Sequence, residues 1–389
     1  MLRRNLKLMD KHIFFITLIM SLFGLFMIFS ASYVKASIID QNSYKYLIKQ
    51  GIILFSSFII FFISINFYTS NYKKITPLLL FLIIVLLFIV IIKGEYVNNA
   101  RSWIKLPFFN LQPSEFAKTV LILYMGIYYG TNLTKIDNYI QLLKPLIVAG
   151  AISFLVIAQP DFGTALIIIM ITGLTYFAIP IKSELKTKLN KTLIYILLFI
   201  ITIFVIAFFN GFRLDESKIQ RFNFLKPCER YTEKGTGYQV CNGYIAINKG
   251  GLFGVGVGNS TQKYLYLPEA HTDFIFPIIV EELGVLVGIL ILMVYFYLIY
   301  RIFIIAKNTS NLTNSIICYG IAIYIFSHVF VNMVGILGLL PLTGVPLPFL
   351  SYGGSFALNL IICMSVVCRI SIENNIYKKE EAIRKKIRG

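Results

Sequence analysis

The chain has 389 residues, of which 57% are hydrophobic and only 14% are charged. A soluble protein of this length could not bury that much apolar surface, so the composition excludes a soluble domain and predicts a multi-pass membrane protein. The formal net charge of +18 does not indicate a nucleic-acid partner. Lys and Arg cluster between apolar segments, where membrane topology and anionic lipid headgroups account for them.

Ten apolar segments predict transmembrane helices, since about 20 helical residues cross the hydrocarbon layer. The first segment follows a basic N-terminus but is longer than the apolar core of a signal peptide, so we expect it to be retained. The distribution of Lys and Arg in the short loops places both termini in the cytoplasm. In chain order the segments cover residues 13–34, 46–67, 75–93, 113–131, 144–160, 162–181, 191–211, 273–300, 315–338 and 353–372.

The sequence therefore predicts an all-α polytopic membrane protein with about ten transmembrane helices, a single integral membrane domain (1–389) and a basic cytoplasmic tail (373–389). Three outer segments are unusual: residues 94–112, the large extracytoplasmic loop 212–272 between helices seven and eight, and residues 338–354. The last contains three prolines, which do not fit a regular helix. Non-helical backbone near the membrane survives only where it is buried in protein or lines a wet cavity. We therefore expect a functional site on the outer face.

Carboxylates and a histidine crowd the start of the eighth segment, in the stretch LPEAHTDFIFPIIVEELG. Asp273 is either a cap in the first turn of a helix, where the dipole favours a carboxylate, or a functional group. The functional interpretation rests on the nearby Glu269 and His271 and on the position at the membrane edge. For Glu281 and Glu282, about two helical turns deeper, we expect buried hydrogen-bonding partners.

The stretch ARSWIKLPFFNLQPSEFAK contains the only tryptophan, Trp103. Glu115 and Lys118 are three residues apart and share a helix face. They form either a local ion pair at a helix start, with Trp103 as an interface anchor, or part of a polar pocket beneath the outer headgroups. Spacing alone leaves both interpretations open. Asp161, in AQPDFGTA, is expected to be a turn residue.

The large outer loop contains several arginines, among them Arg221, and the glycine-rich piece NKGGLFGVGVGNSTQK. These glycines match neither nucleotide-binding pattern and lie on the wrong side of the membrane for a nucleotide. The loop backbone and its arginines would instead suit a phosphorylated lipid. Cys228 and Cys241 face the oxidising side, where they form either a disulfide or two free thiols.

Four motifs, in order along nearly the whole chain, resemble the SEDS family (shape, elongation, division and sporulation) of bacterial membrane proteins. The third motif is closer to the division and sporulation members, which are FtsW-like, than to the elongation members, which are RodA-like. The motifs are ARSWIKLPFFNLQPSEFAK, AQPDFGTA, GYQVCNGYIAINKGGLFGVGVGNSTQKYLYLPEAHTDFIF followed by EELG, and GLLPLTGVPLPFLSYGGS.

The resemblance implies a ten-helix fold and a peptidoglycan glycosyltransferase that polymerises lipid II at the outer face of the bacterial cytoplasmic membrane. Its implied partners are a class B penicillin-binding protein and other divisome or elongasome membrane proteins. The family's essential acid, in its TDF motif, falls on Asp273, and the Glu and Lys of its QPSE…K motif fall on Glu115 and Lys118. The family's xRWxxL pattern appears here as Arg101-Ser102-Trp103. The other expected substrate-binding residues are Arg101, Trp103, Arg221, Gln262, Glu269, His271 and Ser351.

Lipid II carries its sugar on an α-linked diphosphate and the glycan strand is β-1,4 linked, so one in-line attack inverts the anomeric carbon. We expect Asp273 to act as general base and Lys118, Arg101 and Arg221 to neutralise the diphosphate. Glu115 would orient Lys118 or share a divalent cation, Mg or Mn, with Asp273. A lipid II flippase and a non-catalytic scaffold for a penicillin-binding protein are the alternative functions. The polar motifs gather outside rather than at the membrane midplane, which favours an enzyme over a transporter.

Overall fold

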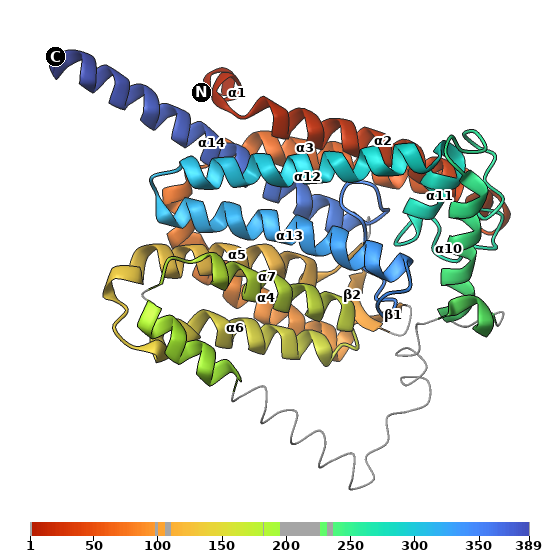
Figure 1. Ribbon diagram of the computed structural model, residues 1–389, viewed down its shortest axis with the longest axis horizontal. Helices are drawn as coiled ribbons and strands as arrows, with labels where there is room; N and C mark the ends of the chain where they lie inside the picture. Colours follow the sequence, from red (N-terminus) through yellow and green to blue (C-terminus); the bar gives the residue numbers. More distant parts are fainter. Residues whose placement is uncertain are drawn as a thin grey trace, which may run out of the picture.

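The long helices of the computed structural model lie side by side, so that the chain runs back and forth through one bundle (Figure 1). The structure describes residues 2–97, 100–105, 110–181, 183–194, 226–231 and 236–388. Its helices are α1 (Leu2–Leu8), α2 (Lys11–Ile38), α3 (Lys45–Ser64), α4 (Tyr72–Lys93), α5 (Pro113–Asn132), α6 (Tyr139–Ile157), α7 (Phe162–Ala178), α10 (Thr236–Gly250), α11 (Ile275–Leu283), α12 (Val285–Asn308), α13 (Leu312–Ile336) and α14 (Gly354–Arg388), with short 3-10 turns η1 (Thr69–Asn71), η2 (Leu133–Lys135) and η3 (Pro227–Arg230).

Both chain termini lie at one end of the bundle (Figure 1). Helices α10 and α11 and strands β1 and β2 lie at the opposite end, the outer end of the bundle (Figure 1). Seven of the described helical segments are long and apolar enough to cross a membrane, as expected for a multi-pass membrane protein. They are Lys11–Ile38, Lys45–Ser64, Thr69–Lys93, Tyr139–Ile157, Val285–Asn308, Leu312–Ile336 and Gly354–Ile387.

All predicted membrane segments except 191–211 coincide with helices in the described part of the chain. Segment 191–211 extends into residues outside the described ranges, so the count of ten transmembrane helices stays a prediction. Helix α14 runs far beyond the predicted end at residue 372 and projects from the bundle as the basic tail (Figure 1).

The predicted continuous segment 273–300 is wrong in one respect, because the helix starts at Ile275 and breaks at Gly284 between α11 and α12. Gly284 has a backbone φ of +90°, a value that residues with a Cβ atom rarely adopt. A Cβ at this position would lie 2.2 Å from the carbonyl oxygen of Leu252. The break therefore exists because the glycine-rich loop after α10 packs directly against the backbone here.

A small antiparallel sheet occupies the outer segment between α4 and α5, where the sequence predicted no strands. It consists of β1 (Glu95–Val97), β2 (Ala100–Lys105) and β3 (Asn110–Leu111), in the order β1-β2-β3. The sheet brings the chain from the end of α4 back to the start of α5 at the outer end of the bundle (Figure 1).

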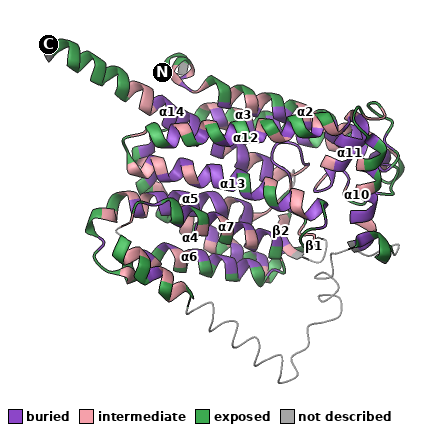
Figure 2. Cartoon of the chain, viewed as in Figure 1, coloured by how far each residue is buried: buried purple, intermediate pink, exposed green. Residues whose placement is uncertain are grey.

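Burial separates the helices into a core and a lipid-facing layer (Figure 2). The apolar stretches of α13 and α14 are largely buried, whereas only 22% of those in α3 and α4 is buried, as suits helices against lipid. Phe55, Phe81 and Phe154 are examples of large apolar side chains on the outside. Polar side chains on α13 are therefore held in the interior, where each needs a partner.

Candidate active site

Asp273 lies in the turn immediately before α11, outside the membrane-spanning helices, and its side chain is buried. The hydroxyl of Thr272 is 3.1 Å from Asp273 Oδ1 and 2.9 Å from Glu269 Oε2, within hydrogen-bonding distance of both carboxylates. Burial, and next the negative charge of Glu269, raise the pKa of Asp273 to about 7. Asp273 therefore exchanges a proton near neutral pH, which is the property required of a general base.

A tight turn produces this crowding of carboxylates. Glu269 has φ +52°, and its carbonyl oxygen accepts hydrogen bonds from the backbone N–H of Thr272 (3.1 Å) and Phe274 (3.3 Å). Asp273 thus lies one residue before the N-cap of α11, and its side chain caps no helix. Among the described residues, Lys35 of α2 lies within ion-pair distance of Glu269, with its Nζ 4.0 Å from Glu269 Oε1.

His271 joins this turn to the segment 338–354. Its carbonyl oxygen accepts a hydrogen bond of 2.9 Å from the backbone N–H of Tyr352. Its ring lies 4.6 Å from the ring of Tyr46 and 5.6 Å from that of Tyr352, measured between centroids. Burial, and next the positive charge of Lys35, lower the pKa of His271 to about 4. The imidazole is consequently neutral at physiological pH and packs between aromatic rings.

The proline-rich segment 338–354 covers Asp273 and is held by α13. The side-chain amide of Asn332 donates to the carbonyl oxygens of Asp273 and Val345, both at 2.8 Å. Gly344 stands close to the carboxylate, since a Cβ there would lie 3.8 Å from Asp273 Oδ2. Ser351 accepts from the backbone N–H of Leu347 at 2.8 Å and so stabilises the fold of this segment.

A second polar centre lies inside the bundle, at the start of α5. Lys118 Nζ is 2.8 Å from Glu115 Oε1 and 3.0 Å from His328 Nε2 of α13. Both members of the Lys118–Glu115 ion pair are buried. Glu115 and Lys118 therefore form a local ion pair, which is one of the two interpretations of their spacing. The pair lies in the interior of the bundle, and Lys118 also contacts His328.

The contacts of His328 define its tautomer. An ammonium group has only donors, so Nε2 of His328 accepts from Lys118. Nδ1 then carries the proton and donates to the carbonyl oxygen of Pro346, 3.2 Å away. Lys118 also lies over the ring of Tyr324, at 5.7 Å from its centroid. His328 thus connects the Lys118–Glu115 pair to the same outer segment that covers Asp273.

Sequence reasoning missed His328 and Asn332. Both are polar residues in the predicted apolar segment 315–338, and they are four residues apart, on one face of a helix. An ionisable residue inside a membrane span is a functional candidate by default, and this signal was available for His328. Their contacts with the proline-rich segment could not be inferred without the fold.

The structure confirms the prediction that Asp161 is a turn residue. Its Oδ1 accepts from the backbone N–H of Thr164 at 3.1 Å and caps the start of α7. Its Oδ2 accepts from the side-chain amide of Gln112 at 3.1 Å. The AQPDFGTA motif is thereby bound to the residue immediately before α5, close to Glu115.

Two other predicted substrate-binding residues lie in the sheet. The guanidinium of Arg101 donates to the carbonyl oxygens of Gly94 (2.8 Å), Ile91 (3.0 Å) and Ile92 (2.6 Å), so it caps the end of α4. Trp103 pairs with Glu95 across β1 and β2 and is half-buried. Arg221 lies outside the described residues.

Glu281 is a buried hydrogen-bonding partner, as expected, and it holds the glycine-rich loop. Its carboxylate accepts from the hydroxyls of Ser260 and Thr261 and from the backbone N–H groups of Thr261 (2.9 Å) and Gln262 (3.3 Å). Lys249 Nζ lies 3.8 Å from the same carboxylate. Gln262, a predicted substrate-binding residue, is buried in this cluster.

Glu282 also has the expected structural role. It accepts from the hydroxyl of Ser30 at 2.8 and 2.7 Å and pairs with Lys263 at 2.9 Å. Both charged side chains are buried. Glu282 therefore joins α11 to α2 through Ser30, and to the loop that follows α10 through Lys263.

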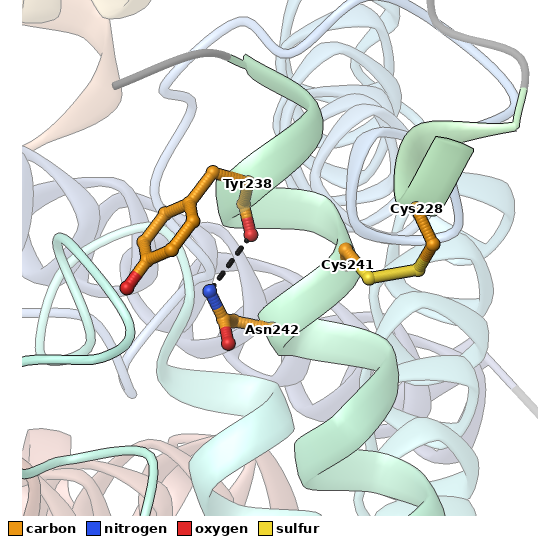
Figure 3. The surroundings of a disulfide bond; sticks show 4 residues. All are labelled: Cys228, Tyr238, Cys241 and Asn242. Carbon is orange, nitrogen blue, oxygen red and sulfur yellow. Dashed lines mark hydrogen bonds between the residues drawn. A yellow bond between two sulfur atoms is a disulfide. The ribbon is translucent and has the colours of Figure 1, made fainter. Parts of the chain in front are cut away.

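Cys228 and Cys241 form a disulfide (Figure 3). This is one of the two states that the sequence left open. The bond fastens η3 to α10, and the side chain of Asn242 donates to the carbonyl oxygen of Tyr238 beside it at 3.0 Å (Figure 3). The other cysteines in the described chain, Cys318, Cys363 and Cys368, are free and buried.

A divalent cation shared by Asp273 and Glu115 stays a prediction. No group of three or more His, Cys, Asp or Glu side chains in the described part of the chain has the arrangement of a metal site. Oε1 of Glu115 accepts from Lys118 at 2.8 Å. The site therefore contains the buried carboxylate of Asp273, with a pKa of about 7, at the outer end of the bundle. It also contains the buried ammonium of Lys118, which contacts His328 of α13.

Comparisons with known proteins agree with this architecture. Residues 10–376 match the model of the FtsW/RodA/SpoVE family, described as cell cycle proteins. The chain is 35% identical to the probable peptidoglycan glycosyltransferase FtsW of Wigglesworthia glossinidia brevipalpis, with 95% of each chain covered.

Two solved structures have the same fold. A chain from a peptidoglycan synthase complex, described for its structural coordination of polymerization and crosslinking, has a TM-score of 0.73 and 20% identity, covering 94% of this chain and 98% of that one. The rod shape determining protein RodA of Thermus thermophilus has a TM-score of 0.66 and 22% identity, covering 93% of this chain and 96% of that one. The chain belongs to the FtsW/RodA/SpoVE family of multi-pass cytoplasmic membrane proteins.

Proposed function

We propose that this protein is a peptidoglycan glycosyltransferase that polymerises lipid II into β-1,4-linked glycan strands at the outer face of the cytoplasmic membrane. One observation carries the proposal: the buried carboxylate of Asp273, with a pKa raised to about 7, lies at the outer end of the bundle beneath the proline-rich segment. Family membership and the FtsW relative support the same activity.

The reaction requires a base and a stabilised leaving group. The Asp273 carboxylate removes the proton from the 4-hydroxyl of the acceptor GlcNAc, and that oxygen attacks the anomeric carbon of the donor. The bond from the anomeric carbon to the diphosphate oxygen breaks, the configuration inverts, and the lipid diphosphate leaves with the electron pair. Diphosphate is a good leaving group once its charge is neutralised, so a second carboxylic acid is not required.

Lys118 is the proposed counter-charge for the diphosphate, but its side chain is enclosed between Glu115 and His328. Direct contact with a phosphate therefore requires this group to open. While it stays closed, the ammonium holds α5 against α13 and the proline-rich segment. A divalent cation, Mg or Mn, has no ligand set among the described residues, and no step is assigned to one.

The proposed partner is a class B penicillin-binding protein, together with other divisome or elongasome membrane proteins. The support is the fold of the solved peptidoglycan synthase complex, in which polymerization and crosslinking are coordinated. The FtsW name of the curated relative favours a role in division over elongation.

The test is polymerisation of purified lipid II by the protein with its partner, comparing wild type with Asp273→Asn. Asp137→Asn, at an exposed position, is the matched control. Strands from wild type and the control, but none from Asp273→Asn, would support the proposal. Strands from all three would move the base elsewhere, and strands from none, with a folded complex, would favour a flippase or scaffold.

A further inference from the structure

A hollow of about 510 Å³ lies beside the end of α1 and the start of α2. Both chain termini are at this end of the bundle, opposite to α10 and α11 (Figure 1). The end of α1, the start of α2, α12 and α14 surround it. Most of its charged side chains are cations. It is lined by Lys7, Leu8, Met9, Asp10, Lys11, His12, Arg301, Asn375, Lys378 and Lys379.

Hydrogen bonds between these elements build the floor of the hollow. Asp10 caps α2 by accepting from Ile13 N at 3.1 Å, and its other carboxylate oxygen forms an ion pair with Arg301 of α12. Asn375 of α14 donates to the carbonyl oxygen of Leu8 at 2.7 Å. The floor is therefore fixed before any ligand arrives, which lowers the entropic cost of binding.

The rim carries unbalanced positive charge. Arg301 neutralises Asp10, which leaves the lysines Lys7, Lys11, Lys378 and Lys379. None of these four has an acidic partner within ion-pair distance in the described ranges, whereas the nearby Lys385 is paired with Glu381. We propose that this hollow binds the phosphodiester headgroup of an anionic phospholipid from the inner leaflet.

The depth of the hollow favours a lipid over a soluble phosphate. Arg301 lies seven residues before the end of α12, about 10 Å of helix at 1.5 Å per residue, so the hollow reaches the membrane interface. The same two helices carry large exposed apolar side chains, including Phe15 on α2 and Phe296 and Tyr300 on α12. A headgroup held by the lysines could therefore lay its acyl chains along these helices.

The test titrates a fluorescent phosphatidylglycerol into the purified full-length protein in neutral detergent, with phosphatidylcholine as the uncharged comparison. The variant Lys11→Gln/Lys378→Gln/Lys379→Gln is expected to bind phosphatidylglycerol about a hundredfold more weakly, at roughly fivefold per lysine. The control Lys73→Gln/Lys74→Gln/Lys307→Gln removes the same charge from exposed lysines that do not line the hollow, and is expected to bind like wild type.

Equal binding of phosphatidylglycerol by both triple variants would overturn the proposal, as would equal binding of the two lipids by wild type. A third arm competes the lipid with glycerol 1-phosphate. Displacement by micromolar glycerol phosphate would assign the hollow to a soluble phosphate and overturn the lipid. If the triple variant fails to fold, Lys378→Gln and Lys379→Gln replace it, because both sit on an exposed part of α14; each should then weaken binding about fivefold.

Discussion

Lys118 Nζ lies 3.0 Å from His328 Nε2, and through this contact α13 holds both the cation of α5 and the segment that covers Asp273. One turn further along α13, Asn332 donates to the backbone carbonyls of Asp273 and Val345. The two polar residues of α13 thus fix the relative positions of the proposed base and the buried ion pair. Positioning of this kind matters to catalysis because small displacements of reacting groups cost large factors in rate.

Substitutions at His328 can test its two hydrogen bonds, to Lys118 and to Pro346, separately. Glutamine can place its carbonyl oxygen near the position of Nε2 and still accept from Lys118, whereas asparagine can place its amide near Nδ1 and still donate to Pro346. Loss of a hydrogen bond to a charged group costs about 1.5–3 kcal/mol, so His328→Asn is expected to polymerise lipid II about 10- to 100-fold more slowly than wild type. His328→Gln is expected to keep most of the activity.

The measurement is the initial rate of polymerisation, with the thermal midpoint of each variant as the control for folding. Equal rates for the two variants would show that the contact with Lys118 carries no special weight. A rate for His328→Gln well below that of His328→Asn would assign the important contact to Pro346 instead.

The pH dependence of the reaction should follow Asp273. Its pKa is raised to about 7, so the basic form is lost as pH falls below neutrality, and kcat/KM should fall about tenfold per pH unit below about pH 7 and level off above it. Glu269→Gln removes a negative charge that raises this pKa. The rising limb of the profile should therefore move to lower pH in the variant.

An unchanged profile in Glu269→Gln would contradict the assignment of Asp273 as the titrating base.

The pH dependence of stability gives an independent check on the pKa of Asp273. Because the folded pKa of Asp273 lies above its ordinary value of 3.8, its contribution to stability is full below pH 3.8 and is lost as pH rises through 7. Asp273→Asn should accordingly be at least as stable as wild type at pH 8, although it is inactive.

Much of this arrangement follows from the sequence, but only up to the level of single elements. Apolar length predicts where α2, α3 and α13 lie. The spacing of Glu115 and Lys118 places them on one helix face, but it leaves their ion pair as only one of two interpretations. His328, the other hydrogen-bonding partner of Lys118, is 210 residues away in the chain, so no local pattern reveals this contact. The role of Arg101 as a cap of α4 likewise depends on the sheet that turns it back on that helix.

The buried ion pair Lys263–Glu282 is expected to be needed for stability rather than for chemistry. Glu282→Gln leaves the Lys263 ammonium buried without a counter-charge, which should lower the free energy of unfolding by about 3–5 kcal/mol. The double variant Lys263→Met/Glu282→Gln removes both charges and should be more stable than Glu282→Gln alone. Thermal unfolding in detergent measures both, and Glu229→Gln, which breaks the exposed pair with Lys226, is the control with an expected change near zero.

The disulfide should stabilise the outer loop. Cys228 and Cys241 are 13 residues apart, and closing a loop of that size contributes about 3 kcal/mol in the chain-entropy description. Cys228→Ser/Cys241→Ser is therefore expected to lower the thermal midpoint, and a reducing agent should lower that of wild type but leave the double variant unchanged. A midpoint of wild type that does not respond to complete reduction would contradict this role.

The break at Gly284 should tolerate no side chain. Gly284→Ala would place a Cβ 2.2 Å from the Leu252 carbonyl at a backbone φ of +90°, so the glycine-rich loop and α11, which carries Glu281 and Glu282, could not keep their positions. We expect a large loss of folded protein on size-exclusion chromatography. The control is Gly173→Ala in α7, where a Cβ meets nothing within 4 Å and helix propensity favours alanine by about 1 kcal/mol. A folded, active Gly284→Ala would mean that α11 and α12 can join into one continuous helix, and that the loop after α10 does not determine the position of the turn that carries Asp273.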